Sequence, residues 1–240
     1  MSKEFYEQTG VAMTCRSYRE YADMFALEPA DLEAGPILDV AGGASSFAAG
    51  AGRNGFEVMA ADPQYAMSRH ELEKHGREEI ETSTAKLKGL AHQYDWSYYG
   101  SLDAHRANRE QSLSLFLADF EREGERRYKP ASLPKLPFED EAFSLVLCSH
   151  FLFLYNRQLD YDFHLAAVRE LIRLLRPEGQ LRIYPLVDLH WQPYPHLEKL
   201  LTELEGEGIS SRTARSGLPF IPGSDSLLVL TKNSGKVLGK

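Results

Sequence analysis

The chain has 240 residues, 43% of them hydrophobic, and a formal net charge of −8 at pH 7. This composition can build one sizeable core, and the length does not demand a second domain. The acidic balance disfavours a broad nucleic-acid-binding surface, because phosphate binding needs clustered Lys and Arg.

The two cysteines, Cys15 and Cys148, are far apart in the sequence. They imply no disulfide framework, which fits a reducing compartment. The N-terminal residues lack the apolar segment of a secretory signal, and the longest strongly apolar run, at 151–155, is too short to cross a bilayer. We therefore expect a cytoplasmic protein that does not enter a membrane.

Residues 1–34 predict a helical N-terminal arm. Four side chains recur with the i, i+3, i+4, i+7 spacing of one helix face: Tyr18, Tyr21, Ala22 and Phe25. A Gly-Pro pair at 35–36 marks the end of this arm.

A strand–helix–strand unit follows the arm. The stretch "ILDVA" (37–41) predicts a short buried strand, and Ser45 or Ser46 can cap the helix after it. Gly55 suits the left-handed position at the end of that helix. The stretch "FEVMAAD" (56–62) predicts the second strand of a βαβ unit.

Residues 66–127 form a long, charged and mostly helical stretch. One amphipathic helix is marked by Leu113, Phe116, Leu117 and Phe120, and Gly124 is expected to stop it. The stretch is longer than a β–α–β connection requires. We expect a helical insertion packed on the core of one domain that spans residues 1–240.

The second half of the chain alternates strands and helices. The expected elements are a strand at 143–148, a helix at about 161–175, a strand at 180–187, a helix at about 195–206, and two closing strands, "ISSRTARS" and "SLLVLTKN". Pro177 and Gly179 are expected to terminate the first of these helices. The alternation predicts an α/β fold with a mostly parallel sheet covered on both faces, and the closing pair predicts an antiparallel edge hairpin.

Two features predict a nucleoside ligand. The first strand ends at Asp39 and is followed by a loop of small residues at 41–46, where a ligand can approach the backbone. The second strand ends at Asp62, whose carboxylate can accept hydrogen bonds from ribose hydroxyls. The loop lacks the third glycine of G-x-G-x-x-G, which counts against a dinucleotide.

Four stretches in this order resemble the motifs of class I S-adenosylmethionine (SAM)-dependent methyltransferases: "ILDVAGGASSFA", "VMAADPQY", "LPFEDEAFSLVLCSHFLF" and "AAVRELIRLLRPEGQLRIY". The resemblance covers about residues 35–187. It implies a Rossmann-like three-layer sandwich with a seven-stranded sheet, and SAM as the cofactor. The arm and the insertion would then form a lid over the methyl acceptor.

The resemblance also implies ten cofactor-binding residues: Asp39, Ala41, Gly42, Gly43, Asp62, Pro63, Ser132, Leu133, Cys148 and Ser149. The first four would cradle the methionine part of SAM, with the backbone of the three loop residues. The next two would bind the ribose and cover the adenine. The serine and leucine at 132–133 stand where the family has its adenine contact, and the last two would meet the methionine ammonium through carbonyls.

Four positions depart from the family pattern. Ala41 and Ser45 replace customary glycines, while Ser132 and Ser144 replace aspartates. Ala41 is tolerable if its φ is negative, and a serine hydroxyl still accepts a hydrogen bond. A fold relative with a degenerate site is the alternative interpretation.

His150 is the candidate catalytic base, because it directly follows the expected strand at 143–148, near the place where the methyl group should emerge. The alternative is a histidine with a purely structural role. SAM carries an already activated methyl group, so the protein has to align the acceptor and, for a hydroxyl, remove a proton. No N/D-P-P-Y motif follows this strand, so methylation of nucleic-acid bases lacks its usual signature.

Further candidates for lining the acceptor pocket follow the expected strands at 143–148 and 180–187. They are Tyr155, Asp160, Asp188, His190 and Trp191. Trp191 is expected either to hold a planar acceptor or to cover the core. In the arm, Arg16 and Tyr18 either close over SAM, with Arg16 meeting its carboxylate, or face solvent.

No histidine pair or mixed Cys/His/Asp run has metal-ligand spacing, so no metal site is expected. A G-x-S-x-G nucleophile elbow is also missing. The sequence favours methyl transfer to a small molecule. Two alternatives stay open: a SAM-binding protein without methyl transfer, and an NAD-linked oxidoreductase.

Overall fold

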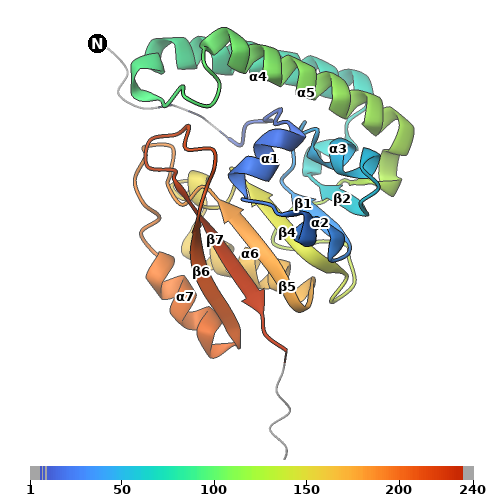
Figure 1. The fold of residues 1–240 in the computed structure, drawn as a ribbon, viewed down its shortest axis with the longest axis vertical. Coiled ribbons are helices and arrows are strands. Elements are labelled where there is room, and N and C mark those ends of the chain that lie inside the picture. The colour runs from blue at the N-terminus through green and yellow to red at the C-terminus, as the bar shows by residue number, and fades with distance from the viewer. Residues whose placement is uncertain (1–5, 7, 9, 235–240) are drawn as a thin grey trace, which may run out of the picture.

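The computed structural model describes Tyr6, Gln8 and residues 10–234. One seven-stranded sheet, ordered β3-β2-β1-β4-β5-β7-β6, runs through it (Figure 1). The strands are β1 (Ile37–Val40), β2 (Val58–Ala61), β3 (Tyr128–Lys129), β4 (Phe143–Ser149), β5 (Leu175–Tyr184), β6 (Ile209–Arg215) and β7 (Ser226–Lys232). β7 pairs antiparallel with both β5 and β6, and the other pairs are parallel. The expected fold class and edge hairpin are confirmed.

Helices cover both faces of the sheet. They are α1 (Tyr18–Met24), α2 (Pro29–Glu33), α3 (Phe47–Arg53), α4 (Arg69–Leu90), α5 (Leu102–Glu123), α6 (Tyr161–Arg173) and α7 (Leu197–Gly206). Alternate strand residues enter different cores, as a pleated strand requires. Ile37 packs in the cluster that holds residues of α1, α3, α4 and α5, whereas Leu38 packs with residues of α6 and α7. The result is a three-layer sandwich.

In the unit from β1 to β2, serines cap the start of α3 and small residues allow its close packing. Ser46 occupies the cap position of α3, but the neighbouring Ser45 hydroxyl accepts the Phe47 N–H at 3.0 Å. A Cβ on Gly50 would lie 2.7 Å from Tyr18, so this glycine lets α1 approach α3 closely. Gly55 has the expected positive φ of 87°.

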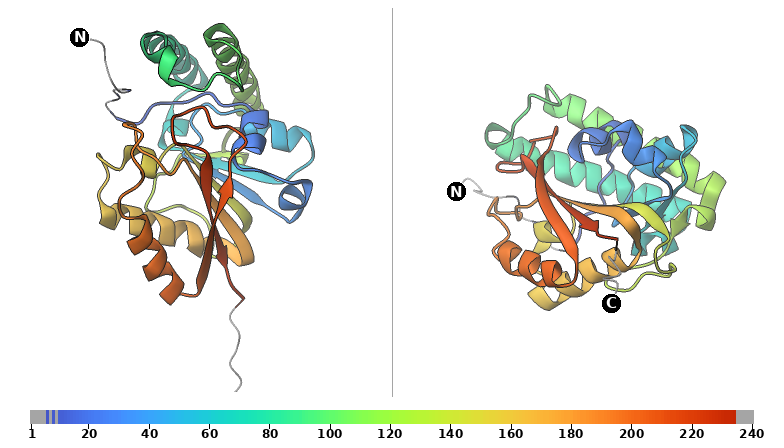
Figure 2. Two further views of the ribbon diagram at one scale, coloured as in Figure 1. Left: turned by 60° about the vertical axis from the view of Figure 1, so that its left-hand side comes forward. Right: turned by 60° about the horizontal axis from the view of Figure 1, so that its bottom comes forward.

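The insertion is a pair of 22-residue helices, α4 and α5. Figures 1 and 2 show them side by side across the end of the sheet at which the parallel strands finish. Of the predicted apolar stripe on α5, Leu113, Phe116 and Leu117 are buried, and Gly124 ends the helix with φ +49°. The stripe belongs to the same buried cluster as β1 and α3.

Two sequence expectations need correction. Six of the seven strands were located in the sequence. The strand that was missed is β3, because its two residues are too few to show alternation. Pro177 and Gly179 do not terminate α6, which ends at Arg173; they lie inside β5. There the pairing with β4 changes register between Phe143 and Leu145, and this irregularity accommodates the proline and the glycine.

In the part of the chain that the structure describes, no helix combines the length and the apolar character needed to span a bilayer.

Candidate functional site

Two cavities lie at the edge where the parallel strands end. The first, here called the strand cavity, sits between the ends of β1 and β2. Five of the ten predicted cofactor-binding residues line it: Ala41, Asp62, Pro63, Ser132 and Leu133. Val11 and Gln64, which the sequence did not single out, line it as well.

Asp62 is the acidic group of the strand cavity. Its Oδ2 accepts the Gly43 N–H at 3.0 Å and its Oδ1 accepts the Gln64 N–H at 2.9 Å. Burial raises the pKa of this carboxyl group, and the two N–H donors lower it in part. Each oxygen keeps one lone pair for a further donor.

Gln64 was missed because nothing in its sequence context marks it as a ligand. Its side-chain Oε1 is buried and accepts no hydrogen bond from the described residues. A buried polar atom without a partner is costly, so this oxygen is poised for a donor from a bound molecule.

The small-residue loop after β1 is strained where the family has glycine. Ala41 has φ +54°, so the negative φ that would make an alanine tolerable at this position is not present. A left-handed L-residue costs about 1–2 kcal/mol, because its Cβ crowds the following carbonyl oxygen. The loop keeps this shape because the Ala41 N–H donates to the Ala61 carbonyl on β2 at 2.9 Å.

Ala41→Gly is therefore expected to raise the free energy of unfolding by about 0.5–1 kcal/mol, the relief of strain less the extra chain entropy of glycine. Urea titration measures it. Ala48→Gly, inside the regular helix α3, is the matched control and should lower stability. A loss of stability in Ala41→Gly as well would mean that the methyl contacts outweigh the strain.

The other five predicted cofactor residues line neither cavity. Asp39 is buried and its Oδ1 accepts the Tyr21 hydroxyl at 3.1 Å. A Cβ on Gly42 would lie 2.8 Å from Asp39 Oδ2. The members of this buried group are Asp39, Gly42, Gly43, Cys148 and Ser149.

Residues 11–16, here called the strap, lie against the loop of this group at Gly43. The Thr14 carbonyl accepts the Ala44 N–H at 3.2 Å, and the Arg16 carbonyl accepts the Ser46 N–H at 2.9 Å. A Cβ on Gly43 would lie 3.1 Å from the Thr14 carbonyl oxygen. Several loop N–H groups expected to face a ligand are thus used within the protein, by the strap and by Asp62.

The second cavity, here called the arm cavity, is bordered by residues 12–16 of the strap. It is lined by residues of the strap, α4, α5 and the loops after β4 and β5, among them Arg16, Glu79, His105, Arg109, His150 and Trp191. The strap lines both cavities: Val11 lines the first, and residues 12–16 line the second.

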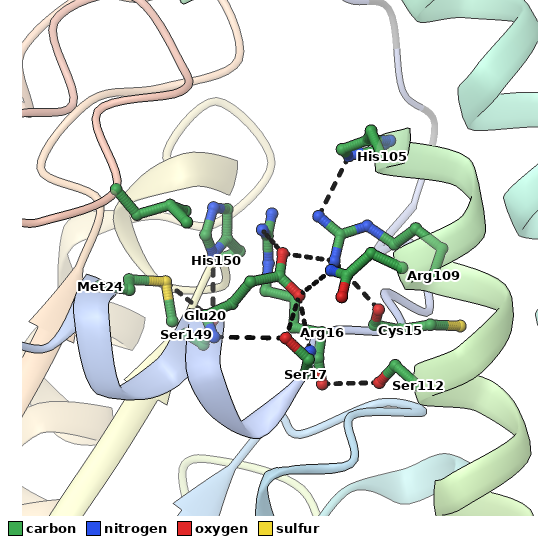
Figure 3. A network of polar contacts seen from close by, with 12 residues as sticks. Cys15, Arg16, Ser17, Glu20, Met24, His105, Arg109, Ser112, Ser149 and His150 are labelled. Atoms are coloured by element: carbon green, nitrogen blue, oxygen red, sulfur yellow. Dashed lines mark hydrogen bonds and ion pairs between the residues drawn. The ribbon is translucent and has the colours of Figure 1, made fainter. Parts of the chain in front are cut away.

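A buried polar network forms one wall of the arm cavity (Figure 3). Glu20 on α1 accepts hydrogen bonds from Arg109 Nη1 at 2.6 Å, the Tyr99 hydroxyl at 2.5 Å and Asn108 Nδ2 at 2.6 Å. Burial alone would raise the pKa of Glu20, but Arg109, Arg16 and the hydrogen bonds lower it to about 2. The ionised carboxylate ties the arm to the insertion.

Arg16 is buried, so the expectation of a solvent-facing side chain is wrong: it is only 7% exposed. Tyr18 also does not reach either cavity; its ring stacks on Phe47 with the centroids 5.6 Å apart. No local pattern reveals the pair of Glu20 and Arg109. The two residues are 89 positions apart in the chain, and each has the spacing of an ordinary polar helix face.

His150 lines the arm cavity in a left-handed conformation, with φ +49°. Its backbone N–H donates to the Tyr184 carbonyl at 2.6 Å, and its ring Nδ1 lies 3.0 Å from the Ser149 hydroxyl. Burial, then the charges of Arg16 and Arg109, lower its pKa well below the usual range. The imidazole is therefore neutral at pH 7.

The remaining candidates divide between the cavity and the scaffold. Tyr155 and Trp191 line the arm cavity, and the Tyr155 hydroxyl accepts the Ala12 N–H at 3.0 Å. Asp188 also lines it but pairs with Arg157 at 2.8 Å and accepts the backbone N–H of His190. Asp160 does not line it, because its side chain caps α6.

Comparison with known proteins finds a methyltransferase domain in part of the chain. Residues 104–183 match the family model described as a methyltransferase domain. The chain is 29% identical over 218 residues to an uncharacterised protein of Methanocaldococcus jannaschii, covering 90% of this chain and 94% of that one.

Solved structures with a similar fold include two from Burkholderia thailandensis. An O-methyltransferase family protein has a TM-score of 0.50 and 15% identity, over 91% of this chain and 57% of that one. The 1,6-didemethyltoxoflavin-N1-methyltransferase, determined with 1,6-didemethyltoxoflavin and S-adenosylhomocysteine, has a TM-score of 0.49 and 16% identity, over 89% and 81%.

The sheet order and the cavity at the ends of β1 and β2 define a Rossmann-like α/β protein with a cavity at the strand ends. The match of residues 104–183 to a methyltransferase domain supports the resemblance to class I SAM-dependent methyltransferases, whose cofactor is SAM.

The strand cavity fits the adenosine half of that cofactor. The free lone pairs of Asp62 suit ribose hydroxyls, and the unpartnered Gln64 Oε1 suits an amino group. Pro63 and Leu133 supply apolar walls for a planar base.

Proposed function

We propose that this protein transfers the methyl group of SAM to a small molecule held in the arm cavity, while the adenosine part of SAM lies in the strand cavity. The observation that carries this proposal is the pair of cavities at one sheet edge, both lined by residues of the strap. The cofactor supplies an activated methyl group. The protein's own part is to orient the acceptor and exclude water.

The arm (residues 1–34) and the insertion (about 66–127) are proposed as the lid of a single domain. Arg16 of the arm and Glu79, His105 and Arg109 of the insertion all line the arm cavity. The Glu20–Arg109 ion pair, at 2.6 Å and buried, joins the two parts. A cover built this way keeps water from the acceptor.

The test uses SAM labelled in its methyl group, incubated with the purified protein and a low-molecular-weight cell extract. The expected result is label in a small molecule together with S-adenosylhomocysteine. Binding of S-adenosylhomocysteine without any transfer would favour the SAM-binding alternative. A rise in melting temperature with NAD but not with S-adenosylhomocysteine would favour the oxidoreductase.

We propose His150 as the general base for an acceptor that loses a proton. It is neutral, it lines the arm cavity, and the Ser149 hydroxyl holds its Nδ1. His150→Gln is expected to lower kcat about 10²–10⁴-fold, with little change in the dissociation constant of S-adenosylhomocysteine.

The matched control is His164→Gln. That histidine is also buried but contacts Tyr194 and the Leu152 carbonyl away from both cavities. Equal kcat values for His150→Gln and the unmodified protein, measured with the acceptor found above, would leave His150 a structural residue.

A further inference from the structure

The arm cavity contains buried donors that find no acceptor. Arg16 is 7% exposed, and its Nε and Nη1 make no hydrogen bond with any described residue. Its Nη1 lies 3.6 Å from Glu20 Oε1, within the range of an ion pair but too far for a hydrogen bond. The Glu20 oxygens are already taken by closer donors.

His105 adds a third such donor. Arg109 Nη2 lies 3.1 Å from His105 Nε2. A guanidinium can only donate, so Nε2 must accept and the ring proton must sit on Nδ1. This Nδ1 is buried and also lacks a partner in the described part of the chain. Burial and the nearby arginines lower the pKa of His105 to about 2, so the ring stays neutral.

All three unpartnered atoms are donors on residues that line one cavity. The acids that also line it do not meet them: Asp188 is held by Arg157 and backbone N–H groups, and Glu79 lies half-exposed on α4. A bound molecule must therefore bring acceptor oxygens. Beside two buried guanidinium groups, an ionised acceptor such as a carboxylate forms the strongest hydrogen bonds.

The rest of the wall is aromatic and apolar. Phe220 stacks on the His105 ring at 5.3 Å, and Trp191 meets Tyr94 edge to face at 6.0 Å. Leu87 and Leu154 complete this side of the cavity. Such a wall suits a planar or apolar body attached to the carboxylate.

We propose that the methyl acceptor is a small aromatic or apolar acid whose carboxylate is bound by Arg16 and His105, with Arg109 holding the His105 tautomer. This rests on the proposed function and names its substrate class. The carboxylate of SAM is the other possible source of acceptor oxygens. His105 lies two turns of α5, about 10 Å, before Ser112, which contacts Ser46 at the cofactor loop. This distance along α5 favours the acceptor for His105, whereas Arg16 contacts the loop through its own carbonyl.

The test measures binding, with no need for turnover. Benzoate supplies only an aromatic ring and a carboxylate, and benzamide is its neutral counterpart. With saturating S-adenosylhomocysteine, benzoate is expected to bind at least tenfold more tightly than benzamide by calorimetry. Arg16→Met should abolish this preference, whereas Arg53→Met, at an exposed arginine on α3, should leave it intact.

Three results would overturn the proposal. One is equal binding of benzoate and benzamide to the unmodified protein, a comparison that needs no variant to fold. Another is a benzoate preference that persists in Arg16→Met. The third is a tenfold loss of S-adenosylhomocysteine affinity in Arg16→Met with unchanged affinity for 5′-methylthioadenosine, because Arg16 would then bind the cofactor carboxylate. A benzoate preference without label transfer from SAM would instead refute the proposed function alone.

Discussion

Glu20→Gln is expected to lower the free energy of unfolding by about 3–5 kcal/mol, because it removes one member of a buried ion pair and leaves the other uncompensated. The Glu20 side chain is 1% exposed and that of Arg109 is 6% exposed. Glutamine has nearly the same shape, so packing is preserved while the charge is lost. Urea or thermal unfolding measures the change.

The control is Glu110→Gln on the same helix as Arg109. Glu110 pairs with Arg106 at 2.9 Å, but its side chain is half-exposed. Exposed pairs of this kind contribute little, so a change below about 0.5 kcal/mol is expected. Similar small losses in both variants would mean that the arm and the insertion are held together without the buried carboxylate.

The effect of Glu20 should also depend on pH. The pKa of Glu20 is about 2 in the folded protein and about 4.3 in an unfolded chain. A group whose pKa is lowered by folding stabilises the protein above its unfolded pKa and loses that contribution as the pH falls toward its folded pKa. The stability gap between the unmodified protein and Glu20→Gln should therefore be full above pH 5 and shrink between about pH 5 and pH 2.

Asp62→Ala is expected to weaken binding of S-adenosylhomocysteine by more than about tenfold. Hydrogen bonds to a charged group contribute about 1.5–3 kcal/mol each, and a ribose offers two hydroxyl donors. Asp62 is well placed for them, since it is buried at the end of β2 and lines the strand cavity. Calorimetry on the folded variant measures the dissociation constant.

Because Asp62 also accepts two backbone N–H groups, its loss should reduce stability as well as binding. Asp160→Ala separates the two effects. Asp160 likewise accepts a backbone N–H, from Phe163 at 2.8 Å, but lies outside the strand cavity. The Asp160→Ala variant should lose about 1 kcal/mol of stability and keep its affinity for S-adenosylhomocysteine. An unchanged dissociation constant in Asp62→Ala would rule out a role in ribose binding.

The strap explains why the predicted cofactor residues divide into two groups. Asp62, Pro63, Ser132 and Leu133 are separated in the chain but meet at adjacent strand ends, as parallel strands require. The loop of the methionine-side group lies against residues 11–16, whose carbonyls take loop N–H groups. No feature of the loop itself predicts this, because the partner is a segment without a motif, about 30 residues earlier.

The amino-acid sequence alone predicts the order of the strands and helices other than β3, the small-residue loop after β1 and the acidic end of β2. These depend on local signals, namely apolar periodicity, caps and motif spacing, which act within about ten residues. The positions of the charged residues of the arm and the insertion follow from the tertiary structure and not from local patterns. Glu20 and Arg109 have the spacing of solvent-facing helix positions and Arg16 precedes α1, yet all three are buried. The burial of Glu20 and Arg109 is stable because the two side chains pair across the fold, and a contact between distant segments leaves no periodic trace in either one.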